Sequence, residues 1–424
     1  MKVVCFGPGP HFKGGISNYN TSLAKSLEKN GATVHIVSWT QQYPAIIPRD
    51  FIDTASKLDF LEGTQIKVTY LTNYNNPVSW KRTVDFISSL QPDIIIFQWA
   101  IALQGLPLGW ITRKLMKSSN AEIIFDCHLV VQKEASGIDR YFSKYGLAAA
   151  HTYIAHAYKT VDELKQLFAE KDFLINETGD RSLDGRQTII KLYHPIYDLF
   201  KPDPGLDIKK VKQELHLKQY VFLFFGFIRK YKGLHNVIRA FKIVANQRND
   251  VSLLIAGESF WNTLDKKRIS TRIKSNLFKW AKAILLKQSA NEQDYNPLEL
   301  IEELGLKEQV TVVNRFIPNE EVPKYFQVSD CIVLYYLTAT PSGVESLSYN
   351  FDLPVLATRV GHFPETIHNG YNGYLADAEN IDSMAKQMLR FIDHPVSREN
   401  VRESTKQMSW DNYVKAILNN EPSV

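Results

Sequence analysis

The sequence predicts an α/β fold made of two doubly wound domains that face each other across a cleft. The chain has 424 residues, and at about 150 residues per domain this length favours two or three domains. Short, nearly continuous apolar runs alternate with longer amphipathic stretches, and this alternation occurs once in each half of the chain. Strand–helix alternation of this kind is typical of a parallel sheet covered by helices on both faces.

Ten apolar runs are short enough to be buried strands. In the first half they are Val3–Phe6, Thr33–Val37, Ile94–Phe97, Ile123–Phe125 and Tyr153–Ile154. In the second half they are Val221–Phe225, Val251–Ile255, Val310–Val313, Cys331–Leu334 and Val355–Ala357. Many of their residues are β-branched, as the strands of a doubly covered sheet usually are.

Amphipathic helices are predicted between these strands. One helix places four apolar residues on a single stripe and ends before Gly31; the four are Ile16, Tyr19, Leu23 and Leu27. A later helix repeats the pattern with Val237, Ile238, Phe241 and Val244. Helical spacing of apolar residues indicates one face packed on a sheet, and glycine is a common helix stop.

Composition excludes several classes of protein. Hydrophobic residues make up 44% and charged residues 22% of the chain, which is typical of a globular protein rather than a disordered or fibrous one. No apolar run is long enough to span a bilayer, and the N-terminus does not resemble a signal peptide. The three cysteines, Cys5, Cys127 and Cys331, lie in apolar runs without paired spacing. We therefore expect a cytoplasmic protein without disulfides.

The net charge of +5 is too small to indicate nucleic-acid binding. The joint between the domains is expected near Tyr193–Tyr197, because three prolines, Pro195, Pro202 and Pro204, make this stretch poor in regular structure. We place the first domain at residues 1–197 and the second at 198–405. Ligands of such folds bind at the carboxyl ends of the strands.

Paired glycines follow the first strand. Gly14 and Gly15 open the first helix, where the free backbone amides of a helix N-terminus suit an anion. A dinucleotide-binding Rossmann loop is the alternative, but the spacing is not G-x-G-x-x-G. The second strand also leads into Ser38–Gln41, with no acidic residue to hold a ribose hydroxyl. A purely structural role for the two glycines is left open.

Two cations follow the first strand of the second half. Arg229 and Lys232 come directly after Gly226 and precede Gly233 and a helix. Fixed cations at the end of a strand suit a diphosphate. The chain has no D-x-D pair to hold a divalent metal, so protein cations would have to stabilise a diphosphate leaving group. A solvated basic loop is the alternative.

A small-residue loop follows the strand Cys331–Leu334. Ser342, Gly343 and Val344 would present backbone amides at the start of a helix, a second cradle for an anion. Glu345 lies in the first turn of that helix, where a carboxylate also favours the helix dipole. Glu345 is therefore either a contact to a ligand or a surface residue.

Motifs in a fixed order resemble the family-4-type retaining glycosyltransferases of the GT-B fold. They run over nearly the full chain and are Gly14-Gly15-Ile16, Gly226 with Arg229, Lys232 and Gly233, Ala256-Gly257-Glu258, Leu304-Gly305-Leu306, Phe316-Ile317-Pro318, Ser329-Asp330, Ser342-Gly343-Val344 and Leu353–Thr358. The resemblance implies two Rossmann-like domains, with a nucleotide-diphosphate sugar (UDP or GDP) on the second and the acceptor on the first. It implies retained anomeric configuration, no cofactor and no essential metal.

The resemblance also assigns roles to residues. It places Arg229, Lys232 and Gly257 among the donor-binding residues, and it matches His128, after Ile123–Phe125, to a histidine beside the transferred sugar. Residues 406–424, which begin with the segment before Ser409-Trp410, are expected to cross back to the first domain. The sequence departs from the family at its pair of glutamates, because the first position falls in the neutral stretch Thr338–Thr340. We expect a variant branch with a Thr-x-Ser-Gly loop, in which Glu345 is the candidate catalytic contact.

The expected function is a metal-independent, hexosyltransferase-type glycosyltransferase that acts on a saccharide or lipid-linked acceptor in cell-surface polysaccharide synthesis. A sugar-nucleotide epimerase or a phosphorylase of the same fold is an alternative. So is an inactive scaffold that binds a partner glycosyltransferase, since the usual glutamate pair is incomplete.

The segment 266–287 is rich in lysine and arginine and contains no acidic residue. Its apolar residues recur at helical spacing, so it predicts a basic amphipathic helix that lies on an anionic membrane surface. The alternative is a helix packed on its own domain. We expect the protein to float with anionic liposomes and a charge-neutralised 266–287 variant to stay in solution. Equal flotation of both proteins would contradict this peripheral membrane contact.

Overall fold

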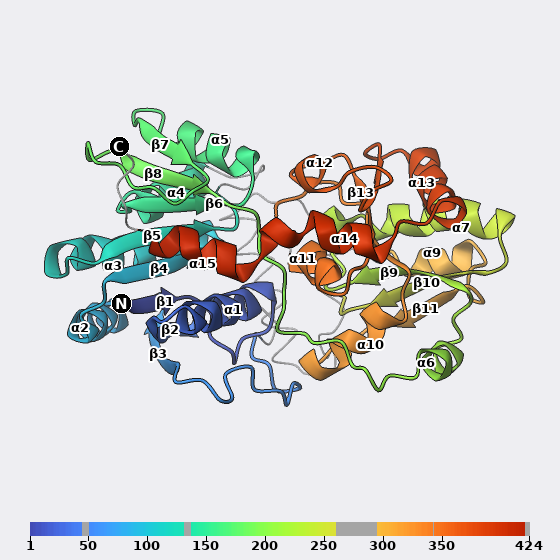
Figure 1. The fold of residues 1–424 in the computed structure, drawn as a ribbon, viewed down its shortest axis with the longest axis horizontal. Coiled ribbons are helices and arrows are strands. Elements are labelled where there is room, and N and C mark those ends of the chain that lie inside the picture. The colour runs from blue at the N-terminus through green and yellow to red at the C-terminus, as the bar shows by residue number, and fades with distance from the viewer. Residues whose placement is uncertain (45–50, 131–136, 260–294, 342, 420–424) are drawn as a thin grey trace.

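A computed structural model describes residues 1–44, 51–130, 137–259, 295–341 and 343–419. The segment 266–287 and Ser342 lie outside these described residues. Two α/β units lie side by side, each with its own sheet (Figure 1). Within the described ranges, no helix combines the length and the apolar character needed to cross a bilayer.

Both sheets are parallel, as the sequence predicts. The order of the first is β3 (Lys67–Asn73), β2 (Thr33–Gln41), β1 (Lys2–Phe6), β4 (Ile94–Trp99), β5 (Glu122–Cys127), β6 (Thr152–Ala155), β8 (Gln187–Lys191) and β7 (Phe173–Asn176). The order of the second is β11 (Val310–Val313), β10 (Val251–Ala256), β9 (Tyr220–Phe225), β12 (Cys331–Leu334), β13 (Val355–Thr358) and β14 (Gly373–Ala376). This topology confirms the doubly wound fold class.

The ten expected strands are present, and four described strands were not expected. These are β3, β7, β8 and β14, all at or next to an edge of a sheet. The side chains of β3 are mostly half-buried, so its sequence lacks the continuous apolar run of a central strand. β14 has four residues and begins with glycine, which weakens a strand signal.

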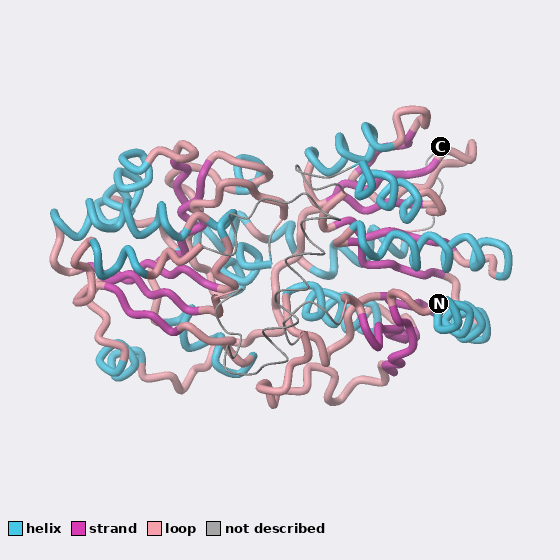
Figure 2. Tube along the Cα trace, turned by 180° about the vertical axis from the view of Figure 1, so that it is seen from behind, coloured by secondary structure: helices cyan, strands magenta, loops and turns pink. Residues whose placement is uncertain are grey.

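Helices cover both faces of each sheet (Figures 1 and 2). In the first unit they are α1 (Gly15–Lys29), α2 (Pro77–Leu90), η1 (Ala102–Gln104), α3 (Gly105–Ser118), α4 (Gly137–Leu147) and α5 (Tyr158–Leu167). In the second they are α6 (Ile208–Glu214), η2 (Lys230–Lys232), α7 (Leu234–Gln247), α9 (Glu299–Glu303), η4 (Asn319–Glu321), α10 (Val322–Gln327), α11 (Gly343–Asn350), α12 (Phe363–Thr366), α13 (Ile381–Asp393) and α14 (Arg398–Ser404). After η5 (Lys406–Met408), the final helix α15 (Trp410–Leu418) follows.

Alternate residues of the first sheet face different helices. Val3 and Cys5 belong to the apolar cluster that includes α1, whereas Val4 and Phe6 belong to the cluster that includes α2 and α3. The two-residue period of a strand therefore builds two layers of core from one run of apolar residues. All three cysteines are buried and unpaired, as expected, and burial raises the pKa of the Cys5 thiol.

The chain crosses between the two units twice. The first crossing follows β8, and there Tyr197 packs between them with its ring buried. In the second, the chain leaves α14 and returns to the first unit, where α15 lies against α1 (Figure 1). Lys29 of α1 and Asp411 of α15 form an exposed ion pair at 3.0 Å.

Helix α3 approaches α4 so closely that Gly105 has no room for a side chain. A Cβ atom on Gly105 would lie 2.1 Å from the carbonyl oxygen of Phe142. The oxygen belongs to the backbone, so it cannot move aside without shifting α4.

We therefore expect Gly105→Ala to lower the free energy of unfolding by about 1–3 kcal/mol, the usual cost of overpacking. Gly137→Ala is the matched control, because Gly137 also begins a helix but a Cβ there would have nothing within 4 Å. Urea unfolding of both variants checks this, and equal stability would contradict the described packing of α3 on α4.

Candidate functional site

Arg229 and Lys232 follow β9, where the short helix η2 brings them to the carboxyl end of the second sheet. The side chain of Lys232 is 6% exposed, and its Nζ atom would lie 3.0 Å from a Cβ on Gly226. The absence of a side chain on Gly226 therefore makes room for the ammonium group. Within the described part of the chain, no carboxylate oxygen lies within the 4.0 Å of an ion pair with Lys232.

Burial and the nearby charge of Arg229 lower the pKa of Lys232 to about 7. Both causes disfavour the ammonium form, and an anion bound beside Lys232 would favour it again. A buried lysine beside an arginine is thus an electrostatically unfavourable arrangement that a bound anion relieves.

Gly257 holds the loop after β10 against the loop after β9. Its φ angle is +153°, and a Cβ atom there would lie 2.0 Å from the carbonyl oxygen of Gly226. Gly257 therefore has a steric role, since only glycine permits this approach of the two loops; its donor-binding role stays a prediction.

The structure brings two helix N-termini together around Tyr197. The Tyr197 hydroxyl donates a hydrogen bond of 2.8 Å to the carbonyl oxygen of Gly15, at the start of α1. Its ring lies 2.7 Å from the position of a Cβ on Gly343, at the start of α11. Gly14, the N-cap of α1, would meet nothing within 4 Å if it carried a Cβ. The predicted Gly14–Gly15 loop and the predicted Gly343–Val344 loop are therefore neighbours.

Val344 connects this pair of helix starts to Lys232. Its Cγ2 atom lies 3.6 Å from the position of a Cβ on Gly226, which also lies next to Lys232. The predicted residues Gly15, Lys232, Gly257, Gly343 and Val344 therefore form one contiguous region. Sequence reasoning missed Tyr197, although an aromatic residue in a proline-containing linker between two glycine-rich loops was a usable signal.

Glu345 is engaged inside the protein. Its side chain is buried, and its Oε1 atom accepts hydrogen bonds from Tyr349 at 3.0 Å and Thr366 at 2.5 Å. Its Oε2 atom pairs with Nε2 of His362. Burial alone would raise the pKa of Glu345, but the charge and hydrogen bonds of these partners bring it below its usual value. The carboxylate therefore links α11 to α12 and to His362, which precedes α12. This structural role was not predicted from the sequence, which suggested a sugar contact or a surface residue.

His128 follows β5, as expected, and belongs to a buried polar network. Its Nε2 atom lies 2.7 Å from Oε1 of Gln98. His156 pairs with Asp126 at 3.0 Å, and His194 lies 2.7 Å from the Ser346 hydroxyl of α11. The network therefore joins β4, β5 and the linker to the second unit. Sequence reasoning missed the partners of His128, although Gln98 and Asp126 were visible as polar residues inside apolar strands.

The three histidines of this network, His128, His156 and His194, lie close to one another. Their candidate ligand nitrogens lie within 4.8 Å of one another. Four-coordinate zinc with bonds of about 2.0–2.1 Å places its ligands roughly 3.4 Å apart. That separation lies within the 4.8 Å limit, and the described residues also give these side chains polar partners inside the protein, namely Gln98, Asp126 and Ser346.

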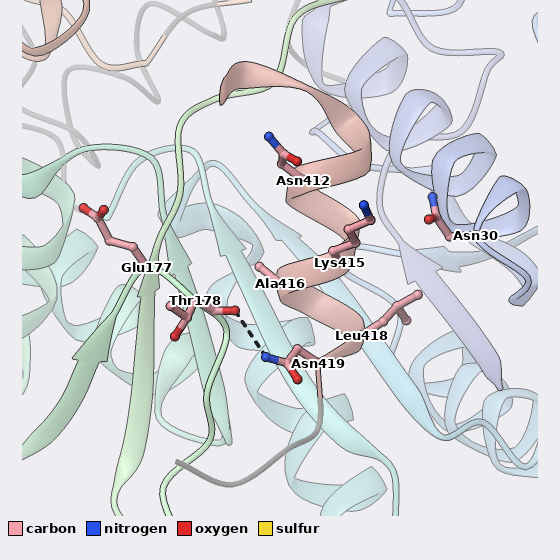
Figure 3. Close-up of a pocket in the computed structure, with 8 residues that line it drawn as sticks. All are labelled: Asn30, Glu177, Thr178, Asn412, Lys415, Ala416, Leu418 and Asn419. Atoms are coloured by element: carbon pink, nitrogen blue, oxygen red, sulfur yellow. Dashed lines mark hydrogen bonds between the residues drawn. The ribbon is translucent and has the colours of Figure 1, made fainter. Parts of the chain in front are cut away.

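A hollow beside α15 lies apart from these residues. Its volume is about 530 Å³, and it is lined by Asn30, Glu177, Thr178, Asn412, Lys415, Ala416, Leu418 and Asn419 (Figure 3). None of the predicted site residues lines it. It lies between α15 and the loop after β7, where the end of the chain packs on the first unit, and not in the region around Lys232.

The Glu345–His362 pair has a measurable consequence. We expect Glu345→Leu and His362→Leu each to lower the free energy of unfolding by about 3–5 kcal/mol, because each leaves a buried polar partner unpaired. The double variant should show a coupling energy of about 1–3 kcal/mol in urea unfolding. The pair Asp352 and Arg402 is the control. Since the Arg402 side chain is 67% exposed, its coupling should stay below about 1 kcal/mol. Equal coupling in both pairs would contradict the described link.

Residues 207–408 match the protein family described as Glycosyl transferases group 1. An uncharacterized glycosyltransferase of Methanocaldococcus jannaschii is 37% identical over 68 residues, which are 15% of this chain and 19% of that protein. Spore coat protein SA of Bacillus subtilis is 23% identical over 275 residues, which are 61% of this chain and 65% of that protein. The chain thus spans less than two thirds of either curated relative.

Solved structures of similar fold cover nearly the whole chain. The structure of Anabaena HepE in complex with UDP-glucose has a TM-score of 0.65 at 15% identity and covers 98% of this chain and 97% of that one. WaaG, described as a glycosyltransferase involved in lipopolysaccharide biosynthesis, has a TM-score of 0.60 at 13% identity and covers 99% and 100%. At these identities the likeness shows the GT-B fold alone. The chain therefore has a GT-B fold, and its residues 207–408 match the family Glycosyl transferases group 1.

Proposed function

We propose that this protein is a retaining glycosyltransferase that moves a sugar from a UDP- or GDP-sugar to a saccharide or lipid-linked acceptor without a metal ion. The observation that carries the proposal is the buried Lys232, which lies beside Arg229 and has no carboxylate of its own in ion-pair range among the described residues. Cations fixed at the carboxyl end of a sheet suit a diphosphate, and this sheet lies within the residues that match the family Glycosyl transferases group 1.

The start of α11 supports the same placement of the diphosphate. Gly343 and Val344 begin this helix, and Val344 lies next to Gly226 and hence next to Lys232. The amides of a helix start carry partial positive charge, so they would add to the field of the two cations. The donor class agrees with the UDP-glucose named for HepE.

In the proposed reaction, the acceptor hydroxyl attacks the anomeric carbon from the face that the diphosphate leaves. The bond from that carbon to the diphosphate oxygen breaks, and the departing phosphate takes the proton of the acceptor hydroxyl. Arg229 and Lys232 stabilise the negative charge that develops on the leaving group. We place acceptor binding on residues 1–197, donor binding on residues 198–405 and the return crossing on residues 406–424.

The biological setting is part of the proposal. WaaG is described as involved in lipopolysaccharide biosynthesis, and another relative is named spore coat protein SA. These descriptions support a role in cell-surface polysaccharide synthesis. A lipid-linked acceptor would bring the protein to the cytoplasmic face of a membrane, where the basic segment 266–287 supplies positive charge.

We expect Arg229→Ala and Lys232→Ala each to lower turnover by roughly 100-fold, the scale of losing one donor to a developing anion. Turnover is measured with the UDP- or GDP-sugar that gives the largest thermal shift of the wild-type protein. Lys230→Ala is the control, because Lys230 lies on the same short helix η2 but, unlike Lys232, is only half-buried, and it is not among the predicted donor-binding residues. Wild-type turnover in both site variants, or loss of activity with a chelator, would contradict the proposal.

A further inference from the structure

Gln98 is a polar residue inside a fully buried strand of the first sheet. Every residue of β4 is buried, and Gln98 is 2% exposed. The strand register pairs Gln98 with Asp126 of β5, so both side chains lie on the same face. The Nε2 atom of Gln98 lies 3.5 Å from Oδ2 of Asp126, and its Oε1 atom lies 2.7 Å from Nε2 of His128. One amide thus bridges a carboxylate and an imidazole.

The charge of Asp126 determines how the side-chain amide of Gln98 is oriented. Burial raises the pKa of Asp126, but the charges and hydrogen bonds of His156, His128 and Tyr19 outweigh it and lower the pKa to about 2. The Tyr413 hydroxyl also donates a hydrogen bond of 3.0 Å to its Oδ2 atom. An ionised carboxylate only accepts hydrogen bonds. Gln98 must therefore turn its NH₂ group toward Asp126.

The orientation of the amide then determines the tautomer of His128. With its NH₂ group facing Asp126, Gln98 presents only an oxygen to His128, and an amide oxygen cannot donate. The Nε2 atom of His128 must therefore carry the proton. Burial lowers the pKa of His128 to about 4, so the ring is neutral near pH 7. Its Nδ1 atom is left with an unshared electron pair.

The position of Gln98 is itself constrained from the opposite side. A Cβ atom on Gly7 would lie 2.7 Å from Cγ of Gln98, so the glycine after β1 leaves the space that this side chain fills. Tyr19 of α1 stands edge-on to the His128 ring, with centroids 4.6 Å apart. The amide and the imidazole are thus both held in place by their neighbours.

We propose that Gln98 is a positioning residue that holds His128 in the Nε2–H tautomer, so that Nδ1 accepts a hydrogen bond from a hydroxyl group of the bound sugar. This inference rests on the proposed function for its ligand, a sugar hydroxyl, but the tautomer is a property of the protein alone. Gln98 acts through His128 and does not itself touch the substrate.

Nitrogen-15 NMR of the histidine rings tests the tautomer directly. The His128 signals are assigned by their loss in His128→Ala. In the wild-type protein at pH 7, we expect the proton of the His128 ring on Nε2 and none on Nδ1. In Gln98→Met, which keeps the size of the side chain but accepts no such bond, we expect this preference to weaken. A proton on Nδ1 in the wild-type protein, or identical spectra in the two proteins, would overturn the proposal.

Steady-state kinetics distinguish a role of Gln98 in positioning His128 from a role in the stability of the fold alone. We expect Gln98→Met to lower kcat roughly tenfold to hundredfold, with a smaller change in the KM of the donor, as for other residues that orient a functional histidine. Gln104→Met is the matched control, because Gln104 is also buried but lies on η1 outside the network. An equal loss in both variants would contradict a positioning role.

Gln98→Glu provides the conservative variant. A glutamate oxygen still accepts the bond from His128, so the tautomer should be retained. Because the new carboxyl group takes the place of an amide 3.5 Å from the ionised Asp126, the two acids should share one proton, and kcat should stay closer to the wild-type value than in Gln98→Met. The other titratable groups that face His128 are Asp126, His156, His194 and Tyr19, and they are unchanged in this variant. A loss of kcat as large as in Gln98→Met would contradict the role of Gln98. A protein that has the expected tautomer but no transferase activity would contradict the proposed function while supporting the assignment of Gln98.

Discussion

The direction of the strands is the constraint on which the rest of the molecule depends. All strands of each described sheet are parallel, so the loops that follow their carboxyl ends gather at one edge. The two edges meet: the Tyr197 ring touches the helix start after β12, and its hydroxyl bonds the helix start after β1. The loop after β11 reaches Lys13, which lies 5.0 Å over the Phe316 ring. Glycine-rich helix starts, cations and polar networks thus concentrate at one junction, although they are far apart in the sequence.

The buried charges at this junction differ in whether the surrounding side chains stabilise their ionised form. Asp126 and Glu345 are each surrounded by side chains that favour their ionised form, so they contribute structure rather than reactivity. Lys232 is buried next to another cation, and no carboxylate among the described residues compensates it. Residues with strongly perturbed pKa values cluster at functional sites. This contrast distinguishes Lys232 from the other buried charges and favours it as the place where an anion binds.

The sequence predicted the central strands and the order of the site loops, because buried parallel strands are continuous apolar runs and helix starts are marked by glycine. It did not predict the edge strands β3 and β7, whose half-exposed side chains carry little pattern. Local patterns also did not reveal the partners of Glu345, since His362 and Thr366 reach it only through the packing of α12 on α11. The same holds for His128, whose orientation depends on a glutamine one strand away. Sequence patterns therefore indicate which segments form the site, whereas the hydrogen bonds of individual side chains emerge only in the folded chain.

The central claim is that protein cations, and not a metal ion, neutralise the diphosphate. Calorimetric titration with UDP and GDP at pH 8, with and without a chelator, tests it most directly. The pKa of Lys232 is about 7 in the free protein, so at pH 8 the side chain is mostly neutral, and a bound diphosphate would favour its charged form. We predict binding that is indifferent to the chelator, takes up a proton at pH 8 and weakens as the pH rises above 7, with the proton uptake lost in Lys232→Met. Binding that requires a divalent metal, or identical proton uptake in the wild-type and variant proteins, would contradict the account.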